Sequence, residues 1–331
     1  MTSTTERVIS SPFPEAVQST MYFIGVTTGE SSIMNVFPAW ADFLDLGDVE
    51  LKGINLALHD APEKYREVVD FIKHDPESLG ALVTTHKIDL FNAAHPLFDV
   101  LEHDAKLMDE ISSIYKKDGK LHGEARDRVT SGLAYERLLP EGHFSGGDGQ
   151  LFIIGAGGSS IALSSYIMKK AAAGREHPDR IIISNRSRPR LEEMQRIHRE
   201  LRDEIGEHIP VEYHLTPEKE QNDAIVNRLP EGSLVINGTG LGKDSPGSPL
   251  TNSVQFPENG IIWDFNYRGD LLFLDQAREQ EKDRGLFIVD GWDYFIYGWT
   301  RVISDVFHIN IPTEGEDFER ISTIASETGR K

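Results

Sequence analysis

Cysteine is absent from the sequence. Its absence excludes disulfide bonds, thiolate metal sites and cysteine nucleophiles, and it is typical of the reducing cytoplasm, where we expect this protein to reside. Long apolar runs are also absent, since no stretch of about 18 apolar residues occurs. Residues 1–18 are polar and contain Glu6, Pro12 and Pro14 where a signal peptide would need an apolar core. We therefore expect a soluble protein that is neither exported nor bound to a membrane.

Basic residues are few in comparison with acidic ones. The 331 residues include 34 Lys and Arg against 54 Asp and Glu, which gives a formal net charge of −20. Such a surplus of negative charge repels the phosphate backbone of nucleic acids, so we expect no nucleic-acid partner. We interpret the charge as that of a well-solvated surface.

Several catalytic signatures are missing as well. The 12 histidines show no H-E-x-x-H spacing and have no cysteine partners, so we expect no metal site. Neither a G-x-S-x-G nucleophile elbow nor a G-x-x-x-x-G-K-(S/T) phosphate loop occurs. Any chemistry must come from other motifs.

Periodic apolar segments are present almost throughout, and the length of 331 residues suits two domains. In the first half, strand-like runs alternate with helical stretches at 22–26, 34–46, 53–58, 62–74, 79–84 and 88–94. This alternation indicates a mostly parallel sheet covered by helices. Residues 111–115 and 120–123 flank Asp118-Gly119, which predicts a hairpin turn.

The second half predicts a doubly wound sheet. A helix at 131–139 and a glycine-rich loop at 141–149 precede it. Strands are expected at 150–154, 180–184, 211–214, 233–237, 260–265 and 286–289, with helices at 159–173, 190–205 and from about 292. The tail 313–331 is polar, and we expect it to fray.

The segment Gly155-Ala156-Gly157-Gly158-Ser159 joins an apolar strand to a helix. Gly155 permits a tight turn, Gly157 lets a pyrophosphate approach the backbone, and the N-terminus of the helix stabilises the negative charge. In this context the motif predicts a dinucleotide site, and we expect all five residues to bind the cofactor.

The end of the second strand of this sheet indicates which dinucleotide binds. An Asp or Glu there would accept hydrogen bonds from the ribose of NAD. The sequence has instead Asn185-Arg186-Ser187-Arg188. The two arginines suit a 2′-phosphate, and Asn185 and Ser187 add neutral donors. The predicted cofactor is therefore NADP.

Together these motifs resemble those of the shikimate dehydrogenases and their quinate-using relatives, over most of the chain. The loop from Gly155 is similar to the family's GAGG loop, and Asn185-Arg186-Ser187 to its N-R-(S/T) motif. Residues 237–242 resemble N-x-T-P-x-G, residues 264–267 resemble D-x-x-Y, and residues 291–300 take the place of G-x-x-M-L-x-x-Q. On this resemblance Thr239 and Gly240 contact the cofactor, with Gly240 replacing the proline.

Two segments resemble the family's catalytic ones. Residues 83–87 are similar to V-T-x-P-x-K, one residue short, and residues 117–127 to D-G-x-L-x-G-x-N-T-D. The resemblance implies that Lys87 is the acid–base group and that Asp127 is its partner. Such a pair suits the oxidation of a secondary alcohol, since the hydroxyl proton must be taken up while hydride leaves to the nicotinamide.

The substrate-binding positions agree less well with the family. The contacts implied by the resemblance are Ser31, Ser32, Thr84, Ser112, Tyr267 and Tyr297. Glu30 stands where the family has the first serine of its carboxylate-binding S-x-S-P-x-x-H-N segment, and Ala125-Arg126 replaces the N-T before the aspartate. Glu30 is either a solvated loop residue or a group that binds a neutral polyol or a cationic substrate. Arg126 is a carboxylate clamp if it points inward. Both alternatives stay open.

We therefore predict a two-domain α/β protein. Residues 1–130 with 292–331 form an α/β substrate-binding catalytic domain, and residues 131–291 form an NADP-binding Rossmann domain with a doubly wound parallel sheet. The predicted reaction is reversible hydride transfer between NADP and a secondary hydroxyl of a cyclic or polyhydroxylated small molecule, similar to shikimate or quinate. A methylene-folate-type dehydrogenase and a non-catalytic NADP-binding or sensing protein are the alternatives. The expected partner is the small-molecule substrate, and a homodimer is left open.

Overall fold

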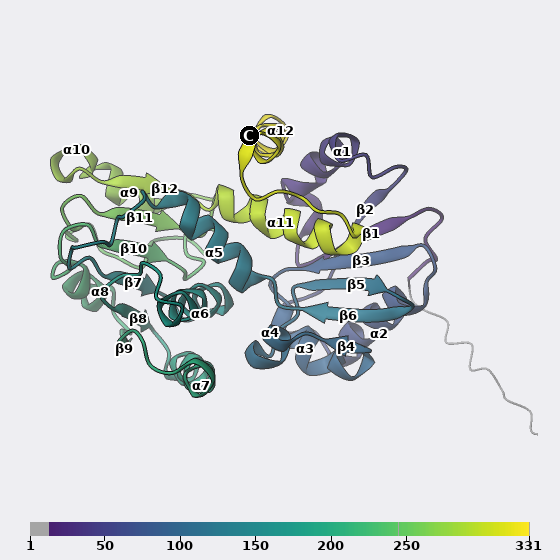
Figure 1. Cartoon of the computed structure of the whole chain (residues 1–331), viewed down its shortest axis with the longest axis horizontal. Helices are drawn as coiled ribbons and strands as arrows, with labels where there is room; N and C mark the ends of the chain where they lie inside the picture. The colour runs from purple at the N-terminus through teal and green to yellow at the C-terminus, as the bar shows by residue number, and fades with distance from the viewer. Residues whose placement is uncertain (1–12, 244, 331) are drawn as a thin grey trace, which may run out of the picture. The chain divides into compact units, whose positions relative to one another are not determined.

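The computed structural model of the protein describes residues 13–243 and 245–330 (Figure 1). The expectation that the N-terminus holds no signal peptide falls largely on residues 1–12, which lie outside this range. No helix among the residues in this range is both long enough and apolar enough to cross a membrane.

The chain divides into two compact units. The first unit is Met1–Arg126 with Trp299–Lys331, and the second unit is Asp127–Gly298. The sequence places the domain borders after residue 130 and before residue 292, and these two borders stay predictions.

The first unit is built on a six-stranded sheet with the order β2-β1-β3-β5-β6-β4. Its strands are β1 (Thr20–Gly25), β2 (Glu50–Asn55), β3 (Ser78–Val83), β4 (Val100–Leu101), β5 (Ser113–Lys117) and β6 (Lys120–Glu124). β1 is parallel to β2 and β3, but β5 is antiparallel to both β3 and β6. β4 is parallel to β6, so the sheet is mostly parallel, as expected, and its two antiparallel pairings both involve β5 of the hairpin.

The predicted hairpin turn is confirmed. Asp118 has φ of 52° and Gly119 has φ of 72°. Two successive positive φ angles define the type I′ turn, which the Asp-Gly pair favours between twisted strands.

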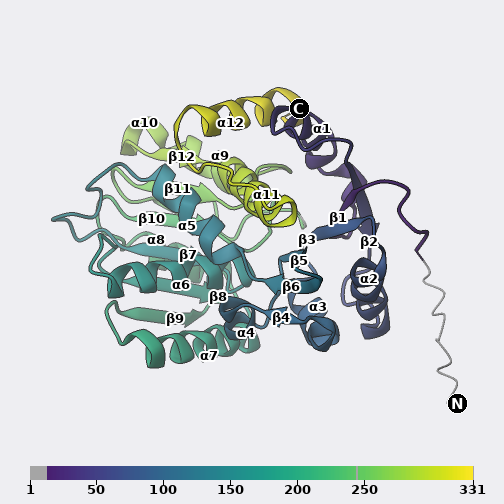
Figure 2. The same ribbon diagram turned by 45° about the vertical axis from the view of Figure 1, so that its right-hand side comes forward.

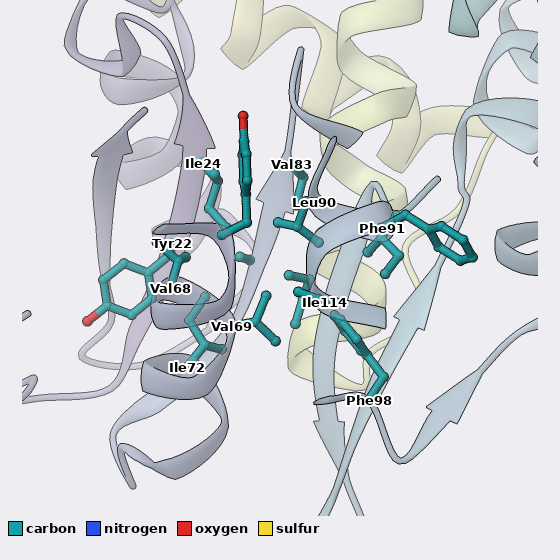
Figure 3. Close-up of a cluster of buried hydrophobic side chains, with 14 of the residues drawn as sticks. Tyr22, Ile24, Val68, Val69, Ile72, Val83, Leu90, Phe91, Phe98 and Ile114 are labelled. Atoms are coloured by element: carbon teal, nitrogen blue, oxygen red, sulfur yellow. The ribbon is translucent and has the colours of Figure 1, made fainter. Parts of the chain in front are cut away.

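Helices pack on both faces of this sheet. They are α1 (Ile33–Phe43), α2 (Pro62–His74), α3 (Lys87–Ala94), α4 (His103–Met108), α12 (Gly315–Gly329) and the last residues of α11 (Trp292–Phe307). Successive residues of a strand point to opposite faces. Tyr22 and Ile24 of β1 join the core formed with Val68 of α2 (Figure 3), whereas Phe23 contacts Trp299 of α11, with ring centroids 5.0 Å apart.

The polar tail does not fray, so that expectation was wrong. Residues Gly315–Gly329 form α12, in which Phe318, Ile321 and Ala325 are buried. The indole N–H of Trp40 in α1 donates to the carbonyl of Ile321, at 2.9 Å. These apolar positions recur at intervals of three and four residues, so a narrow apolar stripe is hidden in a polar sequence.

The second unit contains a fully parallel six-stranded sheet, with the order β12-β11-β10-β7-β8-β9 (Figure 2). Its strands are β7 (Leu151–Ile154), β8 (Ile181–Asn185), β9 (Val211–Leu215), β10 (Leu234–Asn237), β11 (Ile261–Asp264) and β12 (Phe287–Val289). This order is that of a doubly wound Rossmann sheet, in which the chain returns to the middle after its first three strands. The predicted fold class is confirmed.

The helices of the second unit are α5 (Asp127–Leu138), α6 (Gly158–Ala172), α7 (Arg188–Ile205), α8 (Lys219–Val226), α9 (Leu272–Arg278), α10 (Glu281–Arg284) and the start of α11. Every residue of the central strands β7 and β10 is buried, as expected for parallel strands that are covered on both faces. Helix α5 begins four residues before the predicted residue 131, which makes Asp127 its first residue. An aspartate there interacts favourably with the helix dipole.

Candidate functional site

The glycine loop lies between β7 and α6. Gly155 has φ of 106°, and a Cβ added to it would lie 2.7 Å from the carbonyl oxygen of Gly238. Only glycine fits this turn without strain. A Cβ added to Gly157 would find no described atom nearer than the same oxygen, at 3.9 Å. The backbone of Gly157 is therefore approachable at the N-terminus of the 15-residue helix α6, which suits a pyrophosphate.

The other residues of the loop lie around the backbone of Gly157. Ala156 is buried, whereas Gly158 and Ser159 are half-buried in the first turn of α6. Ser160 stands at the third small position of the motif, and its hydroxyl would lie 2.4 Å from a Cβ on Gly238. The helix and the loop after β10 thus approach each other as closely as the motif requires.

Asn185 joins the glycine loop to the segment after β8. Its side-chain oxygen accepts a hydrogen bond from the N–H of Ala156 at 3.3 Å. Its amide nitrogen donates to the carbonyl and the hydroxyl of Ser187, at 2.9 Å and 3.0 Å. The amide therefore shapes both loops, and a direct contact of Asn185 with the cofactor stays a prediction.

Two arginines follow Asn185. Arg186 and Arg188 are exposed, and neither guanidinium group has a hydrogen bond or ion pair with another residue that the structure describes. Two uncommitted guanidinium groups beside a dinucleotide loop can bind a phosphate through charge-assisted hydrogen bonds.

A polar network lies at the ends of β10 and β11. Asn237 accepts hydrogen bonds from the N–H and the hydroxyl of Thr239, at 3.1 Å and 2.6 Å. It donates to Asp264 at 2.8 Å, and Asp264 also accepts from the N–H of Asn266 at 2.8 Å. Burial raises the pKa of Asp264 to about 6, although these hydrogen bonds act in the opposite direction. The network fixes the backbone around Thr239.

Gly240 adopts a backbone conformation that proline, the family's residue at this position, cannot adopt. Its φ is 76°, whereas proline is restricted to about −65°. The turn within residues 237–242 therefore differs from a turn that has proline at position 240. The predicted contact of Gly240 with the cofactor stays a prediction.

In the first unit, the carboxyl ends of three strands meet. A Cβ added to Gly25 at the end of β1 would lie 3.1 Å from methyl groups of both Thr28 and Thr84. The hydroxyl of Thr28 donates to Asn55 at the end of β2, at 2.7 Å. Carboxyl ends of parallel strands are the usual place for ligands in α/β folds. Thr84, a predicted substrate contact, is half-buried at this edge.

The segment after β1 carries the other serine candidates. Ser31 is buried directly after a short helix η1 (Thr28–Glu30), and Ser32 is half-buried before α1. Glu30 is exposed, which agrees with a solvated loop residue and leaves its alternative role in substrate binding as a prediction.

Lys87 is the first residue of α3 and is half-buried. Its carbonyl accepts a hydrogen bond from the N–H of Ile111 at 3.2 Å, which ties it to the segment before β5. The preceding His86 is buried, with its Nδ1 3.2 Å from the hydroxyl of Tyr65. Burial lowers the pKa of His86, so this histidine is neutral near pH 7.

Ser112 and Arg126 lie on adjacent segments. The hydroxyl of Ser112 accepts a hydrogen bond from the backbone N–H of Arg126 at 2.7 Å. The guanidinium of Arg126 pairs with both carboxylate oxygens of Asp305 in α11 and lies 2.8 Å from Glu124. Arg126 is therefore already engaged by two carboxylates. Its role as an inward carboxylate clamp stays a prediction.

Asp127 is buried at the start of α5. The hydroxyl of Tyr294, in the first turn of α11, donates to its Oδ2 at 3.5 Å. Tyr294 is not among the residues predicted from the sequence. The only available signal was its place in the segment 291–300, where the family has methionine.

The remaining substrate candidates lie on either side of Tyr294 in the chain. Tyr267 follows β11 and contacts Trp292 and Phe295, with ring centroids 5.1 Å and 4.8 Å away. Tyr297 is buried in α11. Tyr267 therefore belongs to an aromatic cluster, and both substrate assignments stay predictions.

The candidate residues are divided between the two units. Ser31, Ser32, Thr84, Lys87 and Ser112 belong to the first unit. Asp127, Tyr267, Tyr297 and all the cofactor candidates belong to the second. The pairing of Lys87 with Asp127 takes one residue from each unit and stays a prediction.

Comparison with curated proteins gives relatives of one kind. The chain is 25% identical over 188 residues to the NADP(+) shikimate dehydrogenase of Streptococcus pneumoniae, a match that covers 56% of this chain and 60% of that protein. It is 26% identical over 223 residues to that of Lactococcus lactis, covering 66% and 72%. The chain thus spans less than two thirds of the length of the first of these relatives. No protein-family model matches the chain.

Solved structures share the fold over nearly the whole chain. A shikimate dehydrogenase in complex with NADP+ has a TM-score of 0.68 at 18% identity, covering 96% of this chain and 98% of its own. Quinate dehydrogenase from Corynebacterium glutamicum in complex with NAD has a TM-score of 0.68 at 15% identity, covering 93% and 98%. The 5-ketofructose reductase of a Gluconobacter strain has a TM-score of 0.64 at 16% identity, covering 94% and 98%.

The sequence matches and the structural matches point to the same group as the motifs. The curated matches are shikimate dehydrogenases by name, and the shared fold includes quinate and 5-ketofructose enzymes. The resemblance expected from the sequence motifs is confirmed: the chain is similar to shikimate dehydrogenases in sequence and in fold.

Proposed function

We propose that this protein is an NADP-dependent oxidoreductase that transfers hydride reversibly between NADP and a secondary hydroxyl of a cyclic or polyhydroxylated small molecule. The observation that carries this proposal is the site around the glycine loop. Gly155 and Gly157 keep the backbone approachable at the N-terminus of α6, and Arg186 and Arg188 follow the next strand without partners among the described residues. The relatives named as NADP(+) enzymes support the choice of cofactor.

The residues present fit this cofactor. The N–H groups of Gly158 and Ser159 lie in the first turn of α6, where they have no partner within the helix and would hold the pyrophosphate. Arg186 and Arg188 would bind the 2′-phosphate, because the chain has no acid in that position. When bound, the nicotinamide supplies the acceptor or donor of hydride.

Lys87 and Asp127 would perform the proton transfer. The Nζ of Lys87 would take the hydroxyl proton of the substrate during oxidation and return it during reduction. The carboxylate of Asp127 would accept a hydrogen bond from the reacting hydroxyl and orient it. Buried Asp127 is held at the start of α5, so its carboxylate loses little freedom on binding substrate.

The charges of the first unit favour an uncharged substrate. Arg126 is engaged by Asp305 and Glu124, so its positive charge is already neutralised. Exposed Glu30 adds negative charge next to the serine candidates, which disfavours a carboxylate. A neutral polyol or keto sugar therefore fits better than a hydroxy acid, and the structural likeness to a 5-ketofructose reductase supports this choice.

A turnover assay with four compounds tests the reaction. NADPH formation is followed with shikimate, quinate or myo-inositol, and NADPH consumption with 5-ketofructose. We expect turnover of at least one compound, and a loss of at least about 100-fold in Lys87→Ala. Lys120→Ala is the matched control, because Lys120 is an exposed lysine of the same unit at the hairpin turn. It should retain full turnover.

Each other outcome has a definite meaning. Full turnover in Lys87→Ala would remove this residue from the mechanism. Tight NADP binding with no turnover of any compound would favour the sensing protein. Oxidation of methylenetetrahydrofolate, added as a fifth compound, would favour the folate-type dehydrogenase.

A further inference from the structure

We infer that Tyr294 is a positioning residue that holds the carboxylate of Asp127 for proton transfer. The inference rests on the proposed function, since it takes Asp127 as part of the reacting pair. Its starting point is the hydrogen bond from the hydroxyl of Tyr294 to Oδ2 of Asp127, at 3.5 Å. Contacts of this length in unliganded enzymes commonly shorten when the substrate binds.

The ring of Tyr294 is fixed by its surroundings. It contacts Phe265, with ring centroids 5.4 Å apart, and the edge of Trp263 at 6.4 Å. Trp263 is buried in β11. Aromatic contacts of this kind restrict a tyrosine to one orientation, so the hydroxyl is presented to Asp127 rather than rotating freely.

An ion pair links the residue before Tyr294 to helix α5. Asp293 accepts a hydrogen bond at 3.0 Å from Arg137, near the end of α5. Asp127 begins the same helix. The first turn of α11 therefore contacts α5 at two places, at its first residue Asp127 and near its end at Arg137. These two contacts hold Tyr294 next to Asp127.

The chemistry of the pair indicates its purpose. A phenol can donate a hydrogen bond to an ionised carboxylate, and this interaction stabilises the charge and selects one orientation of the oxygens. Asp127 is buried, where a carboxylate without donors would be costly. Tyr294 thus supplies a donor to this carboxylate and aligns it for a substrate hydroxyl. A purely packing role would need the ring but not the hydroxyl.

The test removes only the hydroxyl. Tyr294→Phe is compared with Tyr166→Phe, because the hydroxyl of Tyr166 also donates to a carboxylate on α5, that of Glu136, at 3.0 Å. Asp127→Asn identifies the carboxyl signal of Asp127 in [13C]carboxyl-aspartate NMR spectra of the whole chain. We expect this signal to move in Tyr294→Phe and to keep its position in Tyr166→Phe.

Turnover gives the functional readout. With whichever of the four compounds is turned over, Tyr294→Phe should lower kcat about tenfold with a smaller change in KM, since one charge-assisted hydrogen bond is lost. Tyr166→Phe should leave kcat and KM unchanged.

The outcomes separate this inference from the proposed function. If Asp127→Asn abolishes turnover while Tyr294→Phe changes neither the NMR signal nor kcat, the inference is overturned and the function stands. If Asp127→Asn retains full turnover, the assigned role of Asp127 fails. If no compound is turned over, the NMR comparison alone decides whether Tyr294 holds Asp127.

Discussion

At the scale of single residues, the guanidinium of Arg126 pairs with two half-buried carboxylates, those of Asp305 and Glu124. Arg126 directs its fork at Asp305, which also accepts a hydrogen bond from Ser113 at 2.9 Å. Glu124 is left with the remaining nitrogen of Arg126. Burial therefore outweighs the attraction of the shared charge and raises the pKa of Glu124 to about 7. Asp305 is 179 residues away from Arg126, a distance over which no local pattern predicts a pair.

The raised pKa of Glu124 makes stability depend on pH. The folded protein favours the protonated carboxyl, so its contribution is complete below the ordinary value of 4.5 and is lost as pH rises through about 7. Replacing Glu124 by glutamine removes this dependence. At about pH 5 the two proteins should unfold at similar temperatures, and at about pH 8.5 Glu124→Gln should be more stable by up to about 3 kcal/mol.

Thermal unfolding of both proteins across this range is the measurement. Titrating groups common to both proteins cancel in the difference between them. A difference that does not change with pH, or one that grows toward low pH, would contradict the raised pKa.

At the scale of elements, strands and helices follow from local patterns with few exceptions. Helix α2 has the predicted bounds, Pro62–His74, because proline begins it and its apolar residues share one face. Strand β4 and helix α4 were not predicted, because two strand residues and six helical ones are too short for a periodic signal. Helix α12 was missed because its apolar stripe is narrow.

Helix α12 is expected to be essential to the first unit. Phe318 is completely buried, so Phe318→Ala should destabilise the protein by about 3–5 kcal/mol through a lost side chain and a cavity. Glu327 lies on the exposed side of the same helix, and Glu327→Ala should change stability by less than about 0.5 kcal/mol. Chemical denaturation measures both. Equal and small effects would mean that the tail adds little to the fold.

At the scale of the whole molecule, the two units differ in what the sequence reveals. The Rossmann unit combines apolar parallel strands with a glycine loop, so its fold follows from the sequence, and its predicted nucleotide site agrees with the local geometry. The first unit offers no comparable motif, and Lys87 was found through resemblance alone. Arg126 and Tyr294 could not be interpreted from the sequence, because their partners Asp305 and Asp127 lie in distant segments.

The central claim is that the second unit binds NADP in preference to NAD, and calorimetric titration of the whole chain with each nucleotide tests it most directly. We predict that NADP+ binds at least about tenfold more tightly, and that this preference is lost in the double variant Arg186→Ala/Arg188→Ala. Arg196→Ala is the control, since Arg196 of α7 is held by Glu193 and Glu200, and it should keep the preference. Equal affinities for NADP+ and NAD+ in the wild-type protein would contradict the account.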